Sequence, residues 1–203
     1  TLTIPETGAN FPAIILVHGS GHTDRNETKM GHFMLLADFF TRNGFAVLRY
    51  DKRGVGSSTG SYDEATTFDF AKDVEAGIAF LKDRKDIDKT RIGIIGHSEG
   101  TLIAPMVASE MHDIAFIVLM GVMGTNGAEI RLQQTQKIAS LNGVPEDEIN
   151  KELEQIKGYH EVLKTNDTKE SKFSTIKAMY PDMSDGMINY FLNPWYSCFI
   201  QLE

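Results

Sequence analysis

A serine stands between two glycines in the stretch RIGIIGHSEGTLIAPM, at residues 91–106. The run before Gly96 is apolar and β-rich, and the small-residue run after Gly100 has a helical pattern. A serine at a strand-to-helix turn can act as a nucleophile, because the turn exposes its hydroxyl at the end of the sheet. GxSxG also fits the small-residue start of a helix in an ordinary nucleotide-type fold. The two flanking elements favour Ser98 as the nucleophile, with glycines on both sides leaving room for a strained backbone.

Acyl transfer at a serine needs backbone N–H groups that stabilise the developing oxyanion. Glu99 follows the nucleophile and supplies one N–H, at the start of the predicted helix. The second donor is expected in the small-residue loop VHGSG at residues 17–21, where the backbone can approach a substrate closely. The candidates in this loop are Ser20 and Gly21.

The serine also needs a general base and an acid that orients it. His18 and His97 lie beside the oxyanion candidates in sequence, but both fit better as packing residues than as the base. Together with Met123 they are candidates for lining a substrate pocket. His112 lies about 20 Å from Ser98 along the predicted helix axis. His160 lies in a charged helical region, and neither of these two histidines follows a strand.

Short apolar runs predict the strands that would position these residues. The predicted strands are residues 2–5, 13–17, 45–50, 91–95 and 114–120, and the predicted helices are residues 32–42, 67–84 and 99–111. Thr67 is the predicted N-cap of the second helix. This alternation predicts a doubly wound, mainly parallel α/β sheet, into which residues 2–10 lead by a hairpin.

The character of the chain changes after Gly121. Residues 125–192 carry several helical patterns and no convincing strand. We therefore expect a core at residues 1–121, an inserted helical cap at 122–196 and the start of a return to the core at 197–203. Apolar side chains of the cap could line a pocket for acyl chains. These are Met123, Phe173, Met179, Met183, Met187 and Phe191.

Two polar loops precede the serine motif. The stretch DKRGVGSS, residues 51–58, has the composition of a turn with unusual dihedral angles. A phosphate-binding loop is the alternative, but GxGxxG and Gly-Lys-Ser/Thr are both missing. In the stretch HTDRNET, Asp24, Arg25 and Glu27 are predicted to brace the oxyanion loop, and a contact of Arg25 with substrate is the less favoured reading.

The motifs HGSG, YDKRGVGSSTG and IGIIGHSEG, in this order, resemble the α/β-hydrolase superfamily. The resemblance covers residues 1 to about 121 and is greatest to a bacterial serine esterase branch, which is dienelactone-hydrolase-like or acyl-CoA-thioesterase-like. It implies helices on both faces of the sheet, Ser98 as nucleophile, and Ser20 or Gly21 with Glu99 as oxyanion donors. It implies no metal or organic cofactor.

In such enzymes an acidic residue and then a histidine follow the serine, on loops after two further strands. Nothing after Met120 has the pattern of those strands. We therefore expect this chain to be the N-terminal part of the fold, without the C-terminal strands or the triad Asp and His. The strand at 114–120 would then be an open edge, and the chain a possible homo-oligomer.

Composition excludes several other classes. A net charge of −8 argues against nucleic acid as a partner, and the single cysteine, Cys198, excludes an internal disulfide or a cysteine metal site. No apolar run approaches the roughly 18 residues of a membrane span. The chain begins at Thr1, so the protein could be cytoplasmic or exported after removal of a signal peptide.

The expected function is that of a serine hydrolase, which cleaves small-molecule carboxylic esters or thioesters through an acyl-enzyme. A non-catalytic α/β-hydrolase-like binding module is the alternative. Among enzymes, a serine peptidase is the second candidate.

Overall fold

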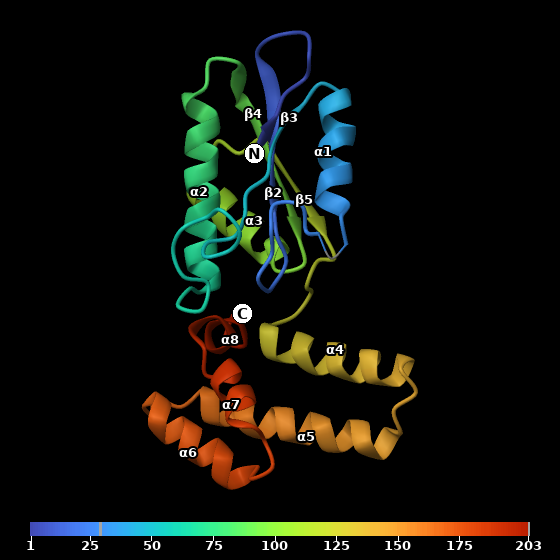
Figure 1. The fold of residues 1–203 in the computed structure, drawn as a ribbon, viewed down its shortest axis with the longest axis vertical. Coiled ribbons are helices and arrows are strands. Elements are labelled where there is room, and N and C mark those ends of the chain that lie inside the picture. The colour runs from blue at the N-terminus through green and yellow to red at the C-terminus, as the bar shows by residue number, and fades with distance from the viewer. Residues whose placement is uncertain (29, 203) are drawn as a thin grey trace. The chain divides into compact units, whose positions relative to one another are not determined.

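The computed structural model describes residues 1–28 and 30–202. The chain divides into two compact units, Thr1–Met123 and Gly124–Glu203 (Figure 1). The first unit is an α/β sheet and the second is helical. Among the described residues, no helix combines the length and the apolar character needed to cross a bilayer.

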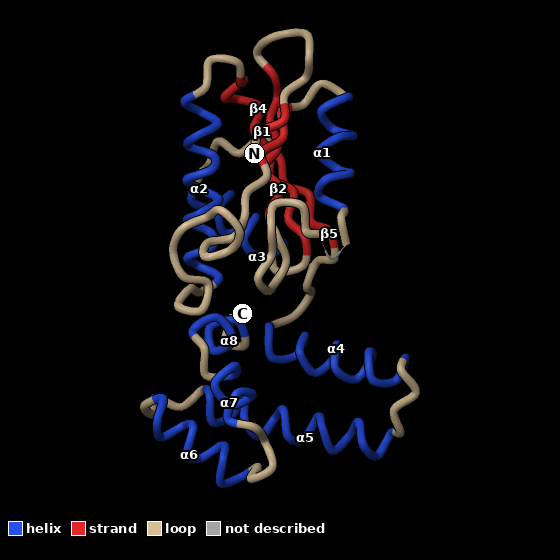
Figure 2. Tube along the Cα trace, viewed as in Figure 1, coloured by secondary structure: helices blue, strands red, loops and turns tan. Residues whose placement is uncertain are grey.

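A five-stranded sheet forms the centre of the first unit (Figure 2). Its strands are β1 (Leu2–Thr3), β2 (Phe11–Val17), β3 (Ala46–Leu48), β4 (Ile87–His97) and β5 (Phe116–Met120). The strand order is β1-β3-β2-β4-β5, and only the β1–β3 pair is antiparallel. The mainly parallel sheet predicted from the sequence is confirmed.

The hairpin predicted for residues 2–10 is wrong. β1 pairs with β3, with Leu2 opposite Leu48, and the Thr1 carbonyl accepts a hydrogen bond from the Arg49 amide at 2.9 Å. The reason is that β3 and β4 occupy both sides of β2, so β2 has no edge left for β1.

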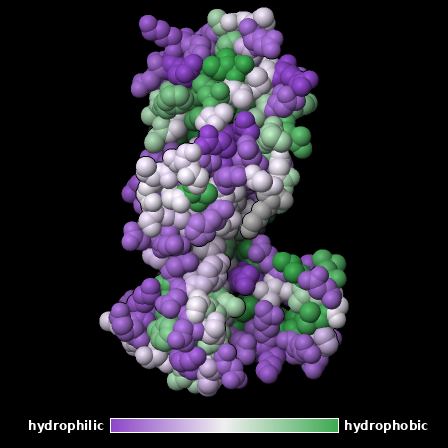
Figure 3. All heavy atoms as spheres, viewed as in Figure 1, coloured by the Kyte–Doolittle hydropathy of each residue, from purple (hydrophilic) through white to green (hydrophobic). Residues whose placement is uncertain are grey.

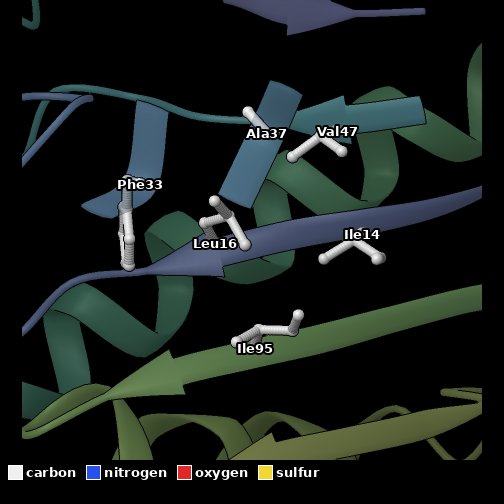
Figure 4. Close-up of a cluster of buried hydrophobic side chains, with 6 residues drawn as sticks. All are labelled: Ile14, Leu16, Phe33, Ala37, Val47 and Ile95. Atoms are coloured by element: carbon white, nitrogen blue, oxygen red, sulfur yellow. The ribbon is translucent and has the colours of Figure 1, made fainter. Parts of the chain in front are cut away.

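Helices cover both faces of the sheet. They are α1 (His32–Arg42), α2 (Thr67–Asp83) and α3 (Gly100–Glu110). Even-numbered side chains of β2 pack toward α1 in one cluster, which contains Ile14, Leu16, Phe33, Ala37, Val47 and Ile95 (Figure 4). On the opposite face, a Cβ on Gly77 of α2 would lie 2.6 Å from Ile15 Cδ1. The alternation of β2 thus separates the two layers and gives the doubly wound arrangement.

The start of α2 differs from the prediction by one residue. Thr66, not Thr67, is the N-cap: its hydroxyl accepts from the Asp69 amide, and the Asp69 carboxylate accepts from the Thr66 amide at 2.9 Å. This reciprocal capping box satisfies two amides at once. Thr67 is therefore the first helical residue, and its buried side chain is available for another contact.

β5 forms one edge of the sheet, and within residues 1–28 and 30–202 its one partner strand is β4. Its apolar side chains are unusually accessible, with Phe116 36%, Ile117 37% and Val118 43% exposed. An apolar edge strand with this exposure is a surface that proteins normally cover or pair.

The second unit contains five helices and no strand among residues 124–202. They are α4 (Gly127–Leu141), α5 (Glu146–Leu163), α6 (Lys169–Met179), α7 (Asp185–Phe191) and α8 (Pro194–Phe199). Aromatic rings form its centre, where Tyr159 of α5 stacks on Phe191 of α7 with centroids 4.1 Å apart. Figure 3 shows hydrophobic side chains on the surface of this unit near the α4–α5 connection, where Ile138 and Leu141 are exposed.

The helical character predicted for residues 125–192 is confirmed. Two expectations stay predictions: that residues 122–196 act as a cap, and that residues 197–203 begin a return to the core.

Candidate active site

The backbone at Ser98 has the strained conformation of a nucleophile turn. Its φ is +51°, a left-handed value that non-glycine residues rarely adopt. The turn connects β4 directly to α3. A Cβ on Gly96 would lie 2.0 Å from the Gly100 carbonyl oxygen, and one on Gly100 would lie 2.3 Å from the Val17 carbonyl oxygen. Only glycine therefore fits at positions 96 and 100, two residues before and two residues after Ser98.

Main-chain hydrogen bonds hold the serine on both sides. The Ser98 amide donates to the Met120 carbonyl at 2.9 Å, which ties the turn to the end of β5. The Ser98 carbonyl accepts from the Thr101 amide at 2.8 Å and from the Thr101 hydroxyl at 2.6 Å. Within the described part of the first unit, Ser98 Oγ makes no hydrogen bond of its own. The backbone thus fixes the position of a hydroxyl that no described residue of this unit engages in a hydrogen bond.

The loop after β2 passes close to this serine. A Cβ on Gly19 would lie 3.1 Å from Ser98 Cβ. The Gly21 amide, one of the two predicted oxyanion donors, instead donates to the Tyr62 hydroxyl at 3.0 Å. The Ser20 amide makes no hydrogen bond to any residue that the structure describes. The Gly21 amide thus already has a partner, which favours Ser20 over Gly21; both stay predicted oxyanion donors.

A buried carboxylate, that of Glu27, braces the same loop. Glu27 Oε1 accepts from the Gly19 amide at 2.9 Å. Its Oε2 lies 3.1 Å from His97 Nδ1 and 2.5 Å from His32 Nε2. The predicted bracing role of Glu27 agrees with these contacts. His97, a predicted pocket residue, has a side chain that is 22% exposed and paired with Glu27.

The same three side chains are the group in the described residues that could hold a metal ion, since their donor atoms lie within 4.8 Å of one another. Two ligands of a tetrahedral zinc site are separated by roughly 3.3 Å, given zinc bonds of about 2.0–2.1 Å. The 2.5 Å separation between His32 Nε2 and Glu27 Oε2 is too short for two ligands of one zinc ion. The geometry therefore favours a cluster of close His–Glu pairs over a zinc site.

His18 does not fit its predicted place in a substrate pocket. It is 0% exposed, and its ring centroid lies 5.3 Å from that of Phe33 and 4.8 Å from that of Tyr50. Burial, together with the charge of Lys52, lowers the pKa of His18 to about 3. His18 is thus a neutral packing residue that presents no surface to a ligand.

The polar loop at residues 22–28 is tied to the turn at 51–58 by Arg25 and Asp51. The Arg25 guanidinium forms an ion pair with the Asp51 carboxylate, which also accepts from the Arg25 amide at 2.8 Å and the Ser57 amide at 3.0 Å. These bonds hold the pKa of Asp51 well below its usual range. Asp24 instead closes its own turn by accepting from the Asn26 amide. The structural role predicted for both loops is supported.

Sequence reasoning missed a buried ion pair beside the serine. Lys52 is 2% exposed, and its Nζ lies 3.0 Å from Glu99 Oε2. The other oxygen of Glu99 accepts from the Thr67 hydroxyl at 2.8 Å. One signal was present in the sequence: Lys52 and Glu99 are charged residues at the ends of two buried strands, where an unpaired charge would be costly.

The remaining histidines lie in other environments. His112 is exposed just beyond the C-terminal end of α3. His160, in the second unit, is 2% exposed and its Nε2 is 2.9 Å from the Tyr196 hydroxyl. Burial lowers the pKa of His160 to about 4. It is therefore part of the interior of that unit.

Phe191 of the second unit does not fit its predicted place in a substrate pocket, because it is only 4% exposed and stacks on Tyr159. Met179 and Met187 are 46% and 50% exposed. Phe173 and Met183 are half-buried, and so is Met123, the last residue of the first unit. These five residues stay candidates.

Comparison with known proteins places these features in context. A family described as serine aminopeptidase, S33, matches residues 9–167. Esterase EstD of Thermotoga maritima is 34% identical over 110 residues, which cover 53% of this chain and 26% of the esterase. An uncharacterized 31.7 kDa protein of Escherichia coli is 28% identical over 188 residues, covering 90% of this chain and 64% of that protein. An acyl transferase of Photobacterium phosphoreum is 31% identical over 147 residues, covering 71% of this chain and 46% of the transferase.

A solved α/β-hydrolase structure from Penicillium, GrgF, superposes with a TM-score of 0.53 at 19% identity. It covers 70% of this chain, and the chain covers 50% of it. This likeness supports the fold. In each of these comparisons the matched region spans less than two thirds of the relative's length.

Proposed function

Because the chain belongs to the serine aminopeptidase S33 family of α/β-hydrolases, we propose that it carries the nucleophile and the oxyanion hole of a serine hydrolase of carboxylic esters or thioesters. The observation that carries the proposal is the left-handed backbone of Ser98 between two glycines that accept no side chain. A binding module has no use for this strain, whereas a nucleophile needs it to present its hydroxyl.

The proposed reaction proceeds through an acyl-enzyme. Ser98 Oγ attacks the acyl carbon and loses its proton to a general base, while the carbonyl electron pair moves onto oxygen. The Ser20 and Glu99 amides donate hydrogen bonds to that oxyanion. The intermediate collapses, the C–O or C–S bond breaks, and the alcohol or thiol leaves with the proton. Water, activated by the same base, then releases the acid.

We propose that the base and its acid partner are a histidine and an Asp or Glu outside the described residues. Four observations support this. His18 is buried and neutral, and His97 Nδ1 is paired with Glu27. No hydrogen bond joins Ser98 Oγ to a histidine in the described part of the first unit. The accessible edge of β5 is where further strands of such a sheet would add, and in this fold the acid and histidine follow such strands.

Replacement of the nucleophile tests the proposal. Ser98→Ala in the full-length protein should lower turnover of short p-nitrophenyl esters by about 10⁴-fold, and abolish labelling by a fluorophosphonate probe. Ser109→Ala is the matched control, because this exposed serine of α3 bonds only the Met106 carbonyl. Ester turnover by Ser98→Ala within tenfold of the unchanged protein would contradict the assignment.

The family description favours one second candidate, a serine peptidase acting on N-terminal residues. Both reactions use the same nucleophile and oxyanion donors. Turnover of aminoacyl p-nitroanilides that exceeds turnover of p-nitrophenyl esters at equal concentration would select the peptidase. We expect the esters to be faster, since one of the relatives that this chain matches is an esterase.

A further inference from the structure

The two proposed oxyanion donors are linked by one buried ammonium group. Lys52 Nζ donates to the Gly19 carbonyl at 2.9 Å and to Glu99 Oε2 at 3.0 Å. Gly19 precedes Ser20, and Glu99 itself carries the second donor. The ammonium therefore joins the oxyanion loop after β2 to the nucleophile turn after β4.

The hydrogen bond from Lys52 to the Gly19 carbonyl also orients the Ser20 amide, because of the geometry of the peptide group. The Gly19 carbonyl and the Ser20 amide belong to one planar group, and no peptide bond between described residues is cis. In a trans peptide the C=O and N–H point in opposite directions. By holding the Gly19 carbonyl, Lys52 directs the Ser20 N–H to the other side. The preceding peptide is fixed too, because the Gly19 amide donates to Glu27.

Contacts on every side hold the ammonium in this position. Lys52 Nζ lies 4.1 Å from the centre of the Phe70 ring and 5.5 Å from that of Tyr62. Glu99 is 0% exposed, and its second oxygen accepts from Thr67 at the first turn of α2. The ion pair thus connects the loop after β2, the nucleophile turn and α2.

A stability role alone accounts poorly for this arrangement. Removing two charges from water is costly, so a buried ion pair is often no more stabilising than apolar residues of the same size. A buried pair does, however, fix geometry closely, because any displacement leaves a charge without its partner. Oxyanion donors need such precision, since a small misplacement weakens the contact where charge develops.

We propose that Lys52 and Glu99 are positioning residues of the oxyanion hole, which together orient the Ser20 and Glu99 amides toward the oxyanion. This inference rests on the proposed serine hydrolase function. The pair touches no reacting atom and acts through the backbone that it holds. Its loss should therefore lower kcat and leave KM nearly unchanged.

The test compares four variants of the full-length protein on a p-nitrophenyl ester. Lys52→Met keeps an unbranched side chain one atom shorter and removes the charge, and Glu99→Gln keeps the backbone donor. Each should lower kcat by about 10²-fold, the usual effect of losing one oxyanion donor, with KM within threefold. The double variant should be no worse than the poorer single variant, because either change already breaks the link. Lys52→Arg should recover at least tenfold over Lys52→Met.

A second readout reports on the oxyanion directly. A trifluoromethyl ketone forms a tetrahedral adduct with the serine, so its affinity should fall in Lys52→Met by the same factor as kcat/KM. Lys82→Met is the matched control, since Lys82 pairs with Asp113 on the surface of the same unit, and it should change neither quantity. Circular dichroism and thermal unfolding establish that each variant is folded.

The outcomes separate this inference from the function on which it rests. If Ser98→Ala keeps activity, the proposed function fails. If Ser98 is required but folded Lys52→Met or Glu99→Gln loses less than tenfold in kcat, only the positioning role is overturned. An equal rise in KM would overturn it as well, because it would indicate a contact with bound substrate. If Lys52→Met does not fold, Glu99→Gln decides by the same limits.

Discussion

At the residue scale, steric fit decides what can stand next to Ser98. The turn at the left-handed serine brings the start of α3 so close to the ends of β4 and β2 that the Gly100 and Val17 carbonyl oxygens occupy the space of side chains at positions 96 and 100. Glu99 and Lys52, by contrast, are held by charge and hydrogen bonds. The site thus combines a rigid turn with a polar link to the neighbouring loop.

This steric fit makes a stability prediction. Gly96→Ala places a Cβ 2.0 Å from the Gly100 carbonyl oxygen, a distance that only backbone movement can relieve. We expect the free energy of unfolding to fall by about 3 kcal/mol, measured by urea denaturation. Gly186→Ala is the control, because a Cβ there meets nothing within 4 Å in α7 and should stabilise the helix slightly. A loss below about 1 kcal/mol in Gly96→Ala would show that the turn can relax.

The sequence predicted Ser98 and Glu99 because a strand, a turn and a helix lie within one short stretch. It could not choose between Ser20 and Gly21, since the residue that decides, Tyr62, is 41 positions from Gly21. Lys52 was missed for the same reason, as its partner Glu99 lies 47 positions away. Contacts of this kind leave no periodic pattern, and only the folded chain shows them.

At the element scale, the positions of strands and helices could be predicted from the sequence. The pairing of the strands could not be predicted as well. Apolar runs and helical spacing located the core elements to within a few residues. The pairing of β1 with β3 depends instead on which sheet edge is open, a property of the whole sheet. The N-cap moved from Thr67 to Thr66 because Asp69 completes a capping box with Thr66.

The helices of the second unit make a prediction about substrate choice. Met179 and Met187 are about half exposed, and flexible thioether side chains adapt to apolar ligands. Replacing both with Ala should change the ratio of turnover on octanoyl and acetyl esters by about tenfold. Met34→Ala, at an exposed position of α1, should leave the ratio unchanged. Equal losses on both esters would indicate that the two methionines only pack the unit.

At the scale of the whole molecule, each unit contains a buried neutral histidine. Burial lowers the pKa of His160 to about 4 in the second unit and that of His18 to about 3 in the first. In the unfolded chain both titrate near 6.5. Below that pH the unfolded chain binds protons that the folded chain does not, so stability must fall as the pH falls.

We therefore expect the free energy of unfolding to decrease from pH 6.5 to about 4, by at most about 1.4 kcal/mol per pH unit for each histidine. His160→Gln can keep a hydrogen bond to Tyr196 and should reduce this slope, measured by urea denaturation at several pH values. His112→Gln, at an exposed position, should not. A slope unchanged in His160→Gln would mean that His160 is protonated in the folded protein.

The central strand has a consequence for how the chain folds. β2 lies between β3 and β4, both of which come later in the sequence, and β4 ends at His97. During synthesis β2 therefore emerges long before its second partner. Its apolar residues stay without that partner until some eighty more residues have been added. Such long-range pairing slows folding and leaves apolar segments exposed to solvent for longer. The pairing of β2 in the first unit can therefore be completed only after β4 and the residues up to the nucleophile turn have been synthesised.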